Sequence, residues 1–194
     1  MDTRSLAKQL GLYLADLPEV KSWGLYGSLQ AGTNDRFSDI DIALDVSGYD
    51  NGDFLLRLPG LVAGAFPVFY SDFAPSLAPE QYLVTLALDQ NNPFVLADIT
   101  CQAAPHIKNV SAQTLRRRNQ PYEHALKLFT ANLKHFLRGA DCRADILKMA
   151  AALAPQQADE ALTEHALLCQ CFAWLKGRAK KEHERYLSVF EALL

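Results

Sequence analysis

The sequence predicts an α+β fold in which a half of mixed strands and helices precedes a purely helical half. Residues 39–46 alternate acidic and aliphatic side chains, and a period of two is typical of a strand with one polar face and one apolar face. From Pro121 onward the chain is rich in Ala, Leu, Lys, Glu and Arg and shows no convincing strand. We therefore expect two domains, at residues 1–110 and 111–194.

The first half is expected to open with an amphipathic helix, because leucines recur at roughly helical spacing until Pro18 ends the pattern. A short strand then runs into a turn at Gly27-Ser28. Further strands are predicted at residues 39–46, 66–70, 81–88 and 94–101. Asn91-Asn92-Pro93 favours a turn, so the last two strands should form an antiparallel hairpin.

The second half is predicted to contain four helices. Gly and Pro residues mark their ends. These helices are expected at residues 122–137, 143–153, 159–177 and 180–193.

Composition places the chain among ordinary globular proteins, with 49% hydrophobic and 21% charged residues. The net charge of -3 argues against a general nucleic-acid binder, whose surface is usually basic. The four cysteines form no C-x-x-C pair and are interpreted as buried thiols, which fits a reducing compartment. No apolar run of about 18 residues is present, so we expect a cytoplasmic protein without a membrane span.

Gly27 and Ser28 are candidates for holding phosphate groups. A Gly-Ser turn after a strand lets backbone N–H groups approach phosphate oxygens closely, and the Ser28 hydroxyl adds a donor. Transfer of a nucleotide from a triphosphate needs such a cradle, together with divalent metals that neutralise charge.

Asp39, Asp41 and Asp98 are the candidate metal ligands and catalytic residues. Asp39 and Asp41 are two positions apart on a predicted strand, so their carboxylates project from one face and suit Mg²⁺. Asp98 lies in an apolar strand, where a charge is costly unless a metal or cation pairs with it. Asp72 and Glu80 are alternative bases for the acceptor.

The run from Gly27 to Asp41, with its Gly32-Thr33 turn and its Ser38 before the acidic pair, resembles the signature of the polymerase-β-type nucleotidyltransferase superfamily. The predicted hairpin and the strand bearing Asp98 are similar to bacterial adenylyltransferases acting on aminoglycosides and lincosamides. The resemblance implies a nucleotidyltransferase fold with a mixed sheet, a C-terminal α-helical bundle, Mg²⁺ as cofactor, and ATP as donor.

These expectations combine into one mechanism. Gly27 and Ser28 hold the phosphates, two Mg²⁺ ions bind the aspartates, and an acceptor hydroxyl attacks the α-phosphate and expels pyrophosphate. Lys127 is the preferred nucleotide-binding candidate from the helical half. The expected acceptor is a small molecule, with an antibiotic-resistance type of activity, and neither stable nucleic-acid binding nor membrane binding is expected.

Several alternatives stay open at this stage. A protein AMP-transferring enzyme or antitoxin would keep the same three aspartates, and an inactive nucleotide-binding protein would keep the fold. An RNA-tailing polymerase is disfavoured because the chain shows no basic track studded with aromatic residues. A homodimer, in which a second subunit completes the cleft, is also open.

Overall fold

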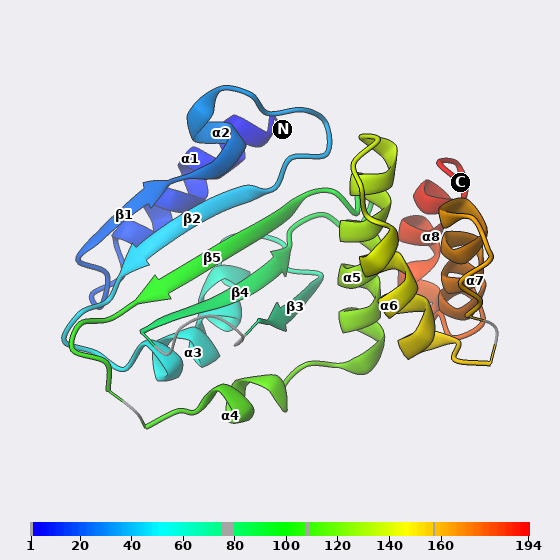
Figure 1. The fold of residues 1–194 in the computed structure, drawn as a ribbon. Coiled ribbons are helices and arrows are strands. Elements are labelled where there is room, and N and C mark those ends of the chain that lie inside the picture. Colours follow the sequence, from blue (N-terminus) through cyan, green and yellow to red (C-terminus); the bar gives the residue numbers. More distant parts are fainter. Residues whose placement is uncertain (1, 75–79, 108, 157) are drawn as a thin grey trace. The chain divides into compact units, whose positions relative to one another are not determined.

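The computed structural model describes residues 2–74, 80–107, 109–156 and 158–194. It contains two compact units (Figure 1). The first comprises Met1–Asp89 and Phe94–Asn119, and the second comprises Gln90–Pro93 and Gln120–Leu194. The predicted domain boundary at residues 110 and 111 stays a prediction.

The first unit is built on a five-stranded mixed sheet with the order β1-β2-β5-β4-β3. Neighbouring strands are antiparallel except β2 and β5, which are parallel. The sheet with its flanking helices agrees with the predicted α+β class, and β5 lies in its middle (Figure 1). The strands are β1 (Ser22–Leu25), β2 (Ile40–Asp45), β3 (Tyr70–Phe73), β4 (Gln81–Ala87) and β5 (Leu96–Gln102).

One face of this sheet forms the hydrophobic core. Along β2 the aliphatic residues Ile40, Ile42 and Leu44 are buried, whereas the residues between them are half-buried, as the alternation predicts. Helices α1 (Thr3–Ala15) and α3 (Asn51–Ala63) both pack on the core face (Figure 1).

The helix α1 matches the predicted opening helix, and the Asp2 carboxylate accepts a hydrogen bond from the Ser5 N–H at 3.3 Å at its start. Helix α3 was not predicted, because Pro59 and two glycines interrupt its apolar pattern. Its start is fixed by the Asp50 carboxylate, which accepts hydrogen bonds from two backbone N–H groups of the first turn.

Two further elements of the first unit differ from expectation. Strand β3 begins at Tyr70, where the predicted strand of residues 66–70 was to end. Helix α4 (Ala112–Arg116) lies in a segment for which no element was predicted, and the Ser111 hydroxyl accepts a hydrogen bond from the Thr114 N–H at its start. The predicted hairpin is confirmed, because β4 and β5 pair antiparallel.

The second unit is helical in its described residues. Positive φ at Gly139 ends α5, as the sequence suggests. Its elements are α5 (Pro121–Leu137), α6 (Arg143–Leu153), α7 (Glu164–Lys176), the short 3₁₀ turn η1 (Lys181–His183) and α8 (Glu184–Glu191). Within the residues that the structure describes, no helix has the length and apolar character that crossing a membrane requires.

All four cysteines are free thiols. Three of them are buried, as expected, and Cys169 is half-buried on α7. Burial raises the pKa of the Cys171 thiol to about 11, so this sulfur stays protonated at neutral pH.

Candidate active site

Four polar side chains form one row across the sheet, on the face opposite the core. Asp41 of β2 is the register partner of Asp98 of β5. Asp98 is in turn paired with Thr85 of β4, and Thr85 with Asp72 of β3. Register partners on adjacent strands project from the same face, so the topology brings residues from four separate strands into line. This row is the candidate active site.

The two carboxylates at the head of the row lie close together. Asp41 and Asp98 occupy adjacent strands, whose backbones run about 4.8 Å apart. Both charges also act on Tyr26, whose hydroxyl is 2.9 Å from the Thr100 Oγ1. The pKa of Tyr26 is raised chiefly by burial, with smaller contributions from the charges of Asp41 and Asp98. Tyr26 therefore flanks the acidic pair.

Gly27 lies against the Asp41 carboxylate. Its φ is 66°, in the left-handed region, and a Cβ added there would lie 2.1 Å from the Asp41 Oδ2. The backbone N–H of Tyr26 donates to the Asp41 carbonyl oxygen at 3.0 Å, which holds the turn on the strand. Glycine is therefore needed at position 27 both for its conformation and for its lack of a side chain.

Ser28 lies in the first turn of the short helix α2 (Gly27–Ala31), directly after this contact. The helix ends at Gly32, whose φ is 72°, and the Thr33 N–H returns to the Ser28 carbonyl oxygen at 3.0 Å. The predicted Gly-Ser turn is thus the start of a single helical turn beside Asp41.

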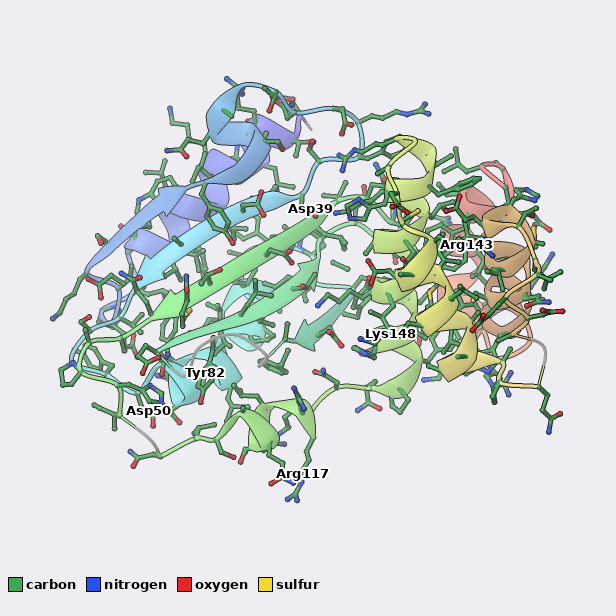
Figure 2. The ribbon with its side chains drawn as sticks, in the orientation of Figure 1. Asp39, Asp50, Tyr82, Arg117, Arg143 and Lys148 are labelled. Carbon is green, nitrogen blue, oxygen red and sulfur yellow. The ribbon has the colours of Figure 1, made fainter. Side chains whose placement is uncertain are left out.

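Asp39 lies one residue before β2 and is half-buried (labelled in Figure 2). The loop that leads to it is closed by the Asp35 carboxylate, which accepts from the Phe37 N–H at 2.9 Å and from the Ser38 hydroxyl at 3.0 Å. The Ser38 hydroxyl oxygen also accepts from the Asp35 N–H at 2.9 Å. Ser38 therefore braces the turn that leads to Asp39.

Thr85 holds the Asp98 carboxylate. Its hydroxyl donates to the Asp98 Oδ1 at 2.5 Å, a short distance that is typical of a hydrogen bond to a charged acceptor. Thr85 is 1% exposed. Sequence patterns did not point to Thr85 or to Tyr26, because each residue acquires its position through strand pairing.

The row fits a magnesium ion that arrives with a nucleotide. Mg²⁺ is usually held by one or two carboxylates, together with waters and substrate phosphates, and Asp41 and Asp98 supply two carboxylates at one point. Over the described ranges of the chain, no three His, Cys, Asp or Glu side chains are grouped closely enough to hold a metal ion by themselves. The chemistry of the pair suits this cation, whereas Asp39 is not brought into a three-residue cluster.

The remaining candidates lie in different places. Glu80 precedes β4 by one residue, five residues from Thr85, or about 17 Å along an extended strand. The structure therefore does not bring Glu80 to the row, whereas Asp72 is part of it and is 1% exposed. Lys127 is a half-buried residue of α5, in the second unit.

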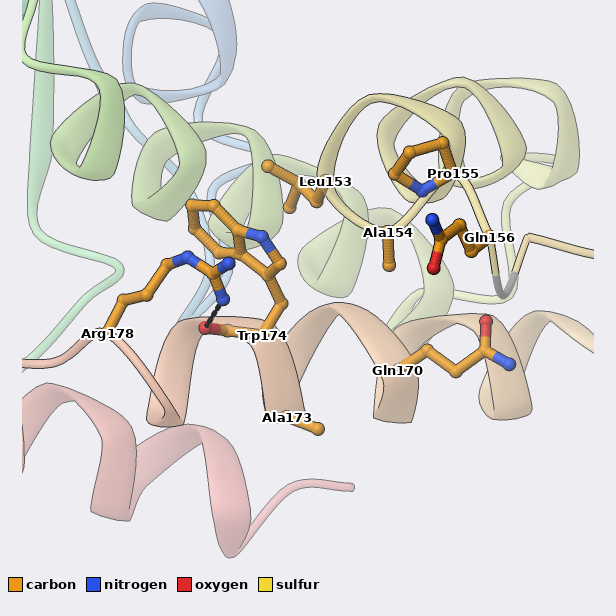
Figure 3. Close-up of a pocket in the computed structure, with 8 residues that line it drawn as sticks. All are labelled: Leu153, Ala154, Pro155, Gln156, Gln170, Ala173, Trp174 and Arg178. Carbon is orange, nitrogen blue, oxygen red and sulfur yellow. Dashed lines mark hydrogen bonds between the residues drawn. The ribbon is translucent and has the colours of Figure 1, made fainter.

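The second unit has a pocket of its own, with a volume of about 500 Å³ (Figure 3). The Arg178 guanidinium lies 4.3 Å from the Trp174 ring centroid and donates to the Trp174 carbonyl oxygen at 3.5 Å. No sequence pattern pointed to this pocket. Its lining residues are Leu153, Ala154, Pro155, Gln156, Gln170, Ala173, Trp174 and Arg178.

Comparison with known proteins gives distant structural likenesses. No family model and no curated protein matches the chain. The chain is similar to a structure of the GLD-2/RNP-8 complex, with 14% identity over 89% of this chain and 77% of that one and a TM-score of 0.40.

It is also similar to the Cid1 poly(U) polymerase bound to MgATP, with 18% identity over 85% of this chain and a TM-score of 0.39. The polymerase core of TRAMP, an RNA surveillance complex, has 12% identity over 92% of this chain and a TM-score of 0.39. The chain spans only 46% and 58% of these two. Likenesses this distant carry no conclusion about the activity of this chain.

Proposed function

We propose that the chain is a Mg²⁺-dependent nucleotidyltransferase that transfers AMP from ATP to a hydroxyl group and releases pyrophosphate. The observation that carries this proposal is the acidic pair Asp41 and Asp98, in register on adjacent strands, with Gly27 packed on the Asp41 carboxylate. The turn that we propose to hold phosphate therefore lies beside two carboxylates whose chemistry suits a hard cation. Those are the two requirements for transferring a phosphoryl-linked group.

Each residue has a role in this proposal. Asp41, Asp98 and Asp39 would hold up to two Mg²⁺ ions, which would neutralise phosphate charge. The backbone N–H groups at Gly27 and Ser28 bind the β- and γ-phosphates. Lys127 stays the nucleotide-binding candidate that the sequence predicts. The attacking hydroxyl loses its proton to a carboxylate of the row, for which Asp98 is the first choice.

A small cationic molecule, such as an aminoglycoside- or lincosamide-like compound, is the proposed acceptor. The net charge of -3 supports a cationic acceptor over a polyanionic one, because long-range attraction favours opposite charge. A protein hydroxyl and an RNA end use the same chemistry, so the test includes both.

The test follows label from ATP carrying ³²P at its α-phosphate into three acceptors: an aminoglycoside and lincosamide panel, a protein lysate and short RNA. We expect Mg²⁺-dependent label on a small molecule. Label confined to protein or to RNA would reject the small-molecule acceptor. Absence of both transfer and Mg²⁺-dependent ATP binding would reject nucleotidyl transfer itself.

Asp98→Asn is the decisive variant, since it removes one charge from the acidic pair. Metal-assisted stabilisation is worth several kcal/mol, so the transfer rate should fall more than about 100-fold. Asp45→Asn is the matched control. Asp45 lies four residues after Asp41 on the same strand face, but its carboxylate accepts a hydrogen bond from the Ser47 N–H at 2.8 Å. Its loss should leave the rate within about threefold of wild type.

A further inference from the structure

Thr85 places a buried hydroxyl group in the middle of the polar row. Its neighbours on β4, Val84 and Leu86, face the hydrophobic core on the other side of the sheet. A buried hydroxyl costs free energy unless it forms a hydrogen bond. At this position the cost is offset by one bond, from the Thr85 Oγ1 to the Asp98 Oδ1 at 2.5 Å.

The direction of this bond is set by the two neighbours of Thr85. The residue lies in register between Asp98 and Asp72, an acid on either side. A threonine hydroxyl has a single proton to donate, and the structure directs it to Asp98. Because threonine is branched at Cβ, its χ1 angle is restricted, so the donor is held in place.

The hydrogen bond from Thr85 to one oxygen of the Asp98 carboxylate sets the role of the other oxygen. With Oδ1 bonded to Thr85, the Asp98 Oδ2 is the oxygen left to face a cation bound beside Asp41. Outer hydrogen-bond partners of this kind orient metal-binding carboxylates and strengthen metal binding.

We propose that Thr85 is a positioning residue, which holds the Asp98 carboxylate in the orientation that binds the divalent cation. This inference rests on the proposed function of the acidic pair. It adds a residue that never touches the nucleotide or the metal and acts only through Asp98. No motif in the sequence contains it.

The test measures Mn²⁺ binding to the full chain, alone and with a non-hydrolysable ATP analogue, from the electron paramagnetic resonance signal of the free ion. Thr85→Val keeps the shape of the side chain but removes the hydroxyl, and we expect Mn²⁺ affinity to fall about 10- to 100-fold. Thr85→Ser keeps the hydroxyl and should bind within about threefold of wild type. In transfer assays, high Mg²⁺ should largely restore the rate of Thr85→Val, because its ligands are intact.

Thr100→Val is the matched control. Thr100 is also a buried threonine of the sheet, 4% exposed, but its hydroxyl pairs with the Tyr26 hydroxyl at 2.9 Å and not with a carboxylate. Its Mn²⁺ affinity should stay within about twofold of wild type. Urea unfolding of each variant separates folding defects from weakened metal binding, and the serine variant tests the proposal even if the valine variant is unstable.

The outcomes separate the inference from the function on which it rests. If Asp98→Asn loses Mn²⁺ while Thr85→Val binds as wild type, the positioning role is overturned and the metal site stands. If Thr85→Ser and Thr85→Val are weakened equally, the hydroxyl is not the cause, and the inference is again overturned. If the wild type binds no Mn²⁺, with or without ATP, the proposed function and this inference fall together.

Discussion

Replacing Gly27 with alanine should disable the site through a single methyl group. The new Cβ would lie 2.1 Å from the Asp41 Oδ2, whereas real contacts of this kind essentially never fall below 3.0 Å. The carboxylate must therefore move by about 1 Å, and a displacement of that size can lower a catalytic rate about 100-fold. Alanine also resists the φ of 66°, which costs about 1–2 kcal/mol of folding stability.

Gly32→Ala isolates the effect of the contact. Gly32 has a φ of 72°, close to that of Gly27, but a Cβ added there meets nothing within 4 Å. Both variants should therefore lose about 1–2 kcal/mol in urea unfolding. Only Gly27→Ala should also lose about 100-fold in nucleotide transfer and in Mn²⁺ affinity. Equal transfer rates in the two variants would refute the argument that Gly27 makes room for the Asp41 carboxylate.

Two further predictions concern stability. A Cβ at Gly11 of α1 would lie 2.0 Å from the Trp23 ring, so Gly11→Ala should lower the free energy of unfolding, measured in urea, by about 1–3 kcal/mol. A Cβ at Gly60 of α3 meets nothing within 4 Å, so Gly60→Ala should raise the free energy of unfolding by up to about 1 kcal/mol. Equal stabilities of the Gly11→Ala and Gly60→Ala variants would contradict the close packing of Gly11 on Trp23. Burial lowers the pKa of His183 below its usual 6.5, and its Nδ1 accepts from the Lys180 N–H at 3.1 Å. The folded chain thus binds fewer protons than the unfolded one, so stability should fall as pH drops below 6.5. His183→Gln should flatten that dependence in unfolding curves at pH 5 to 7.5.

Elements with a regular apolar pattern could be predicted from the sequence, and irregular ones could not. Strand β2 follows its alternation residue by residue, and the four C-terminal helices lie within a few residues of their predicted bounds. In α1 the spacing includes Leu12, which is 52% exposed, because only part of the leucine series faces the sheet. Helix α3 was missed because local signals at Pro59 are overridden by tertiary packing of its buried face.

The sequence predicted several residues of the site, including Asp98 from its charge in an apolar strand, but it did not predict how they are paired across the sheet. Gly27, Ser28 and Asp41 lie within one short run, so their chemistry is visible in sequence order. Pairing Asp41 with Asp98 requires β2 and β5 to be parallel neighbours, although they are far apart in the chain. The position of Thr85 beside Asp98 then follows from the register of the β4 and β5 hairpin, which the residue types alone do not predict.

The core of the first unit also fixes the geometry of the acidic pair. Successive residues of a strand face opposite sides, so β2 supplies Ile40 and Ile42 to the core and Asp41 to the polar face. A slip of one residue between β2 and β5 would turn Asp41 toward the core and expose its aliphatic neighbours. Burying an unpaired carboxylate costs several kcal/mol, whereas the native register buries only apolar groups there. The hydrophobic face therefore selects the register that sets the two carboxylates side by side, so the alignment of the site is a consequence of core packing.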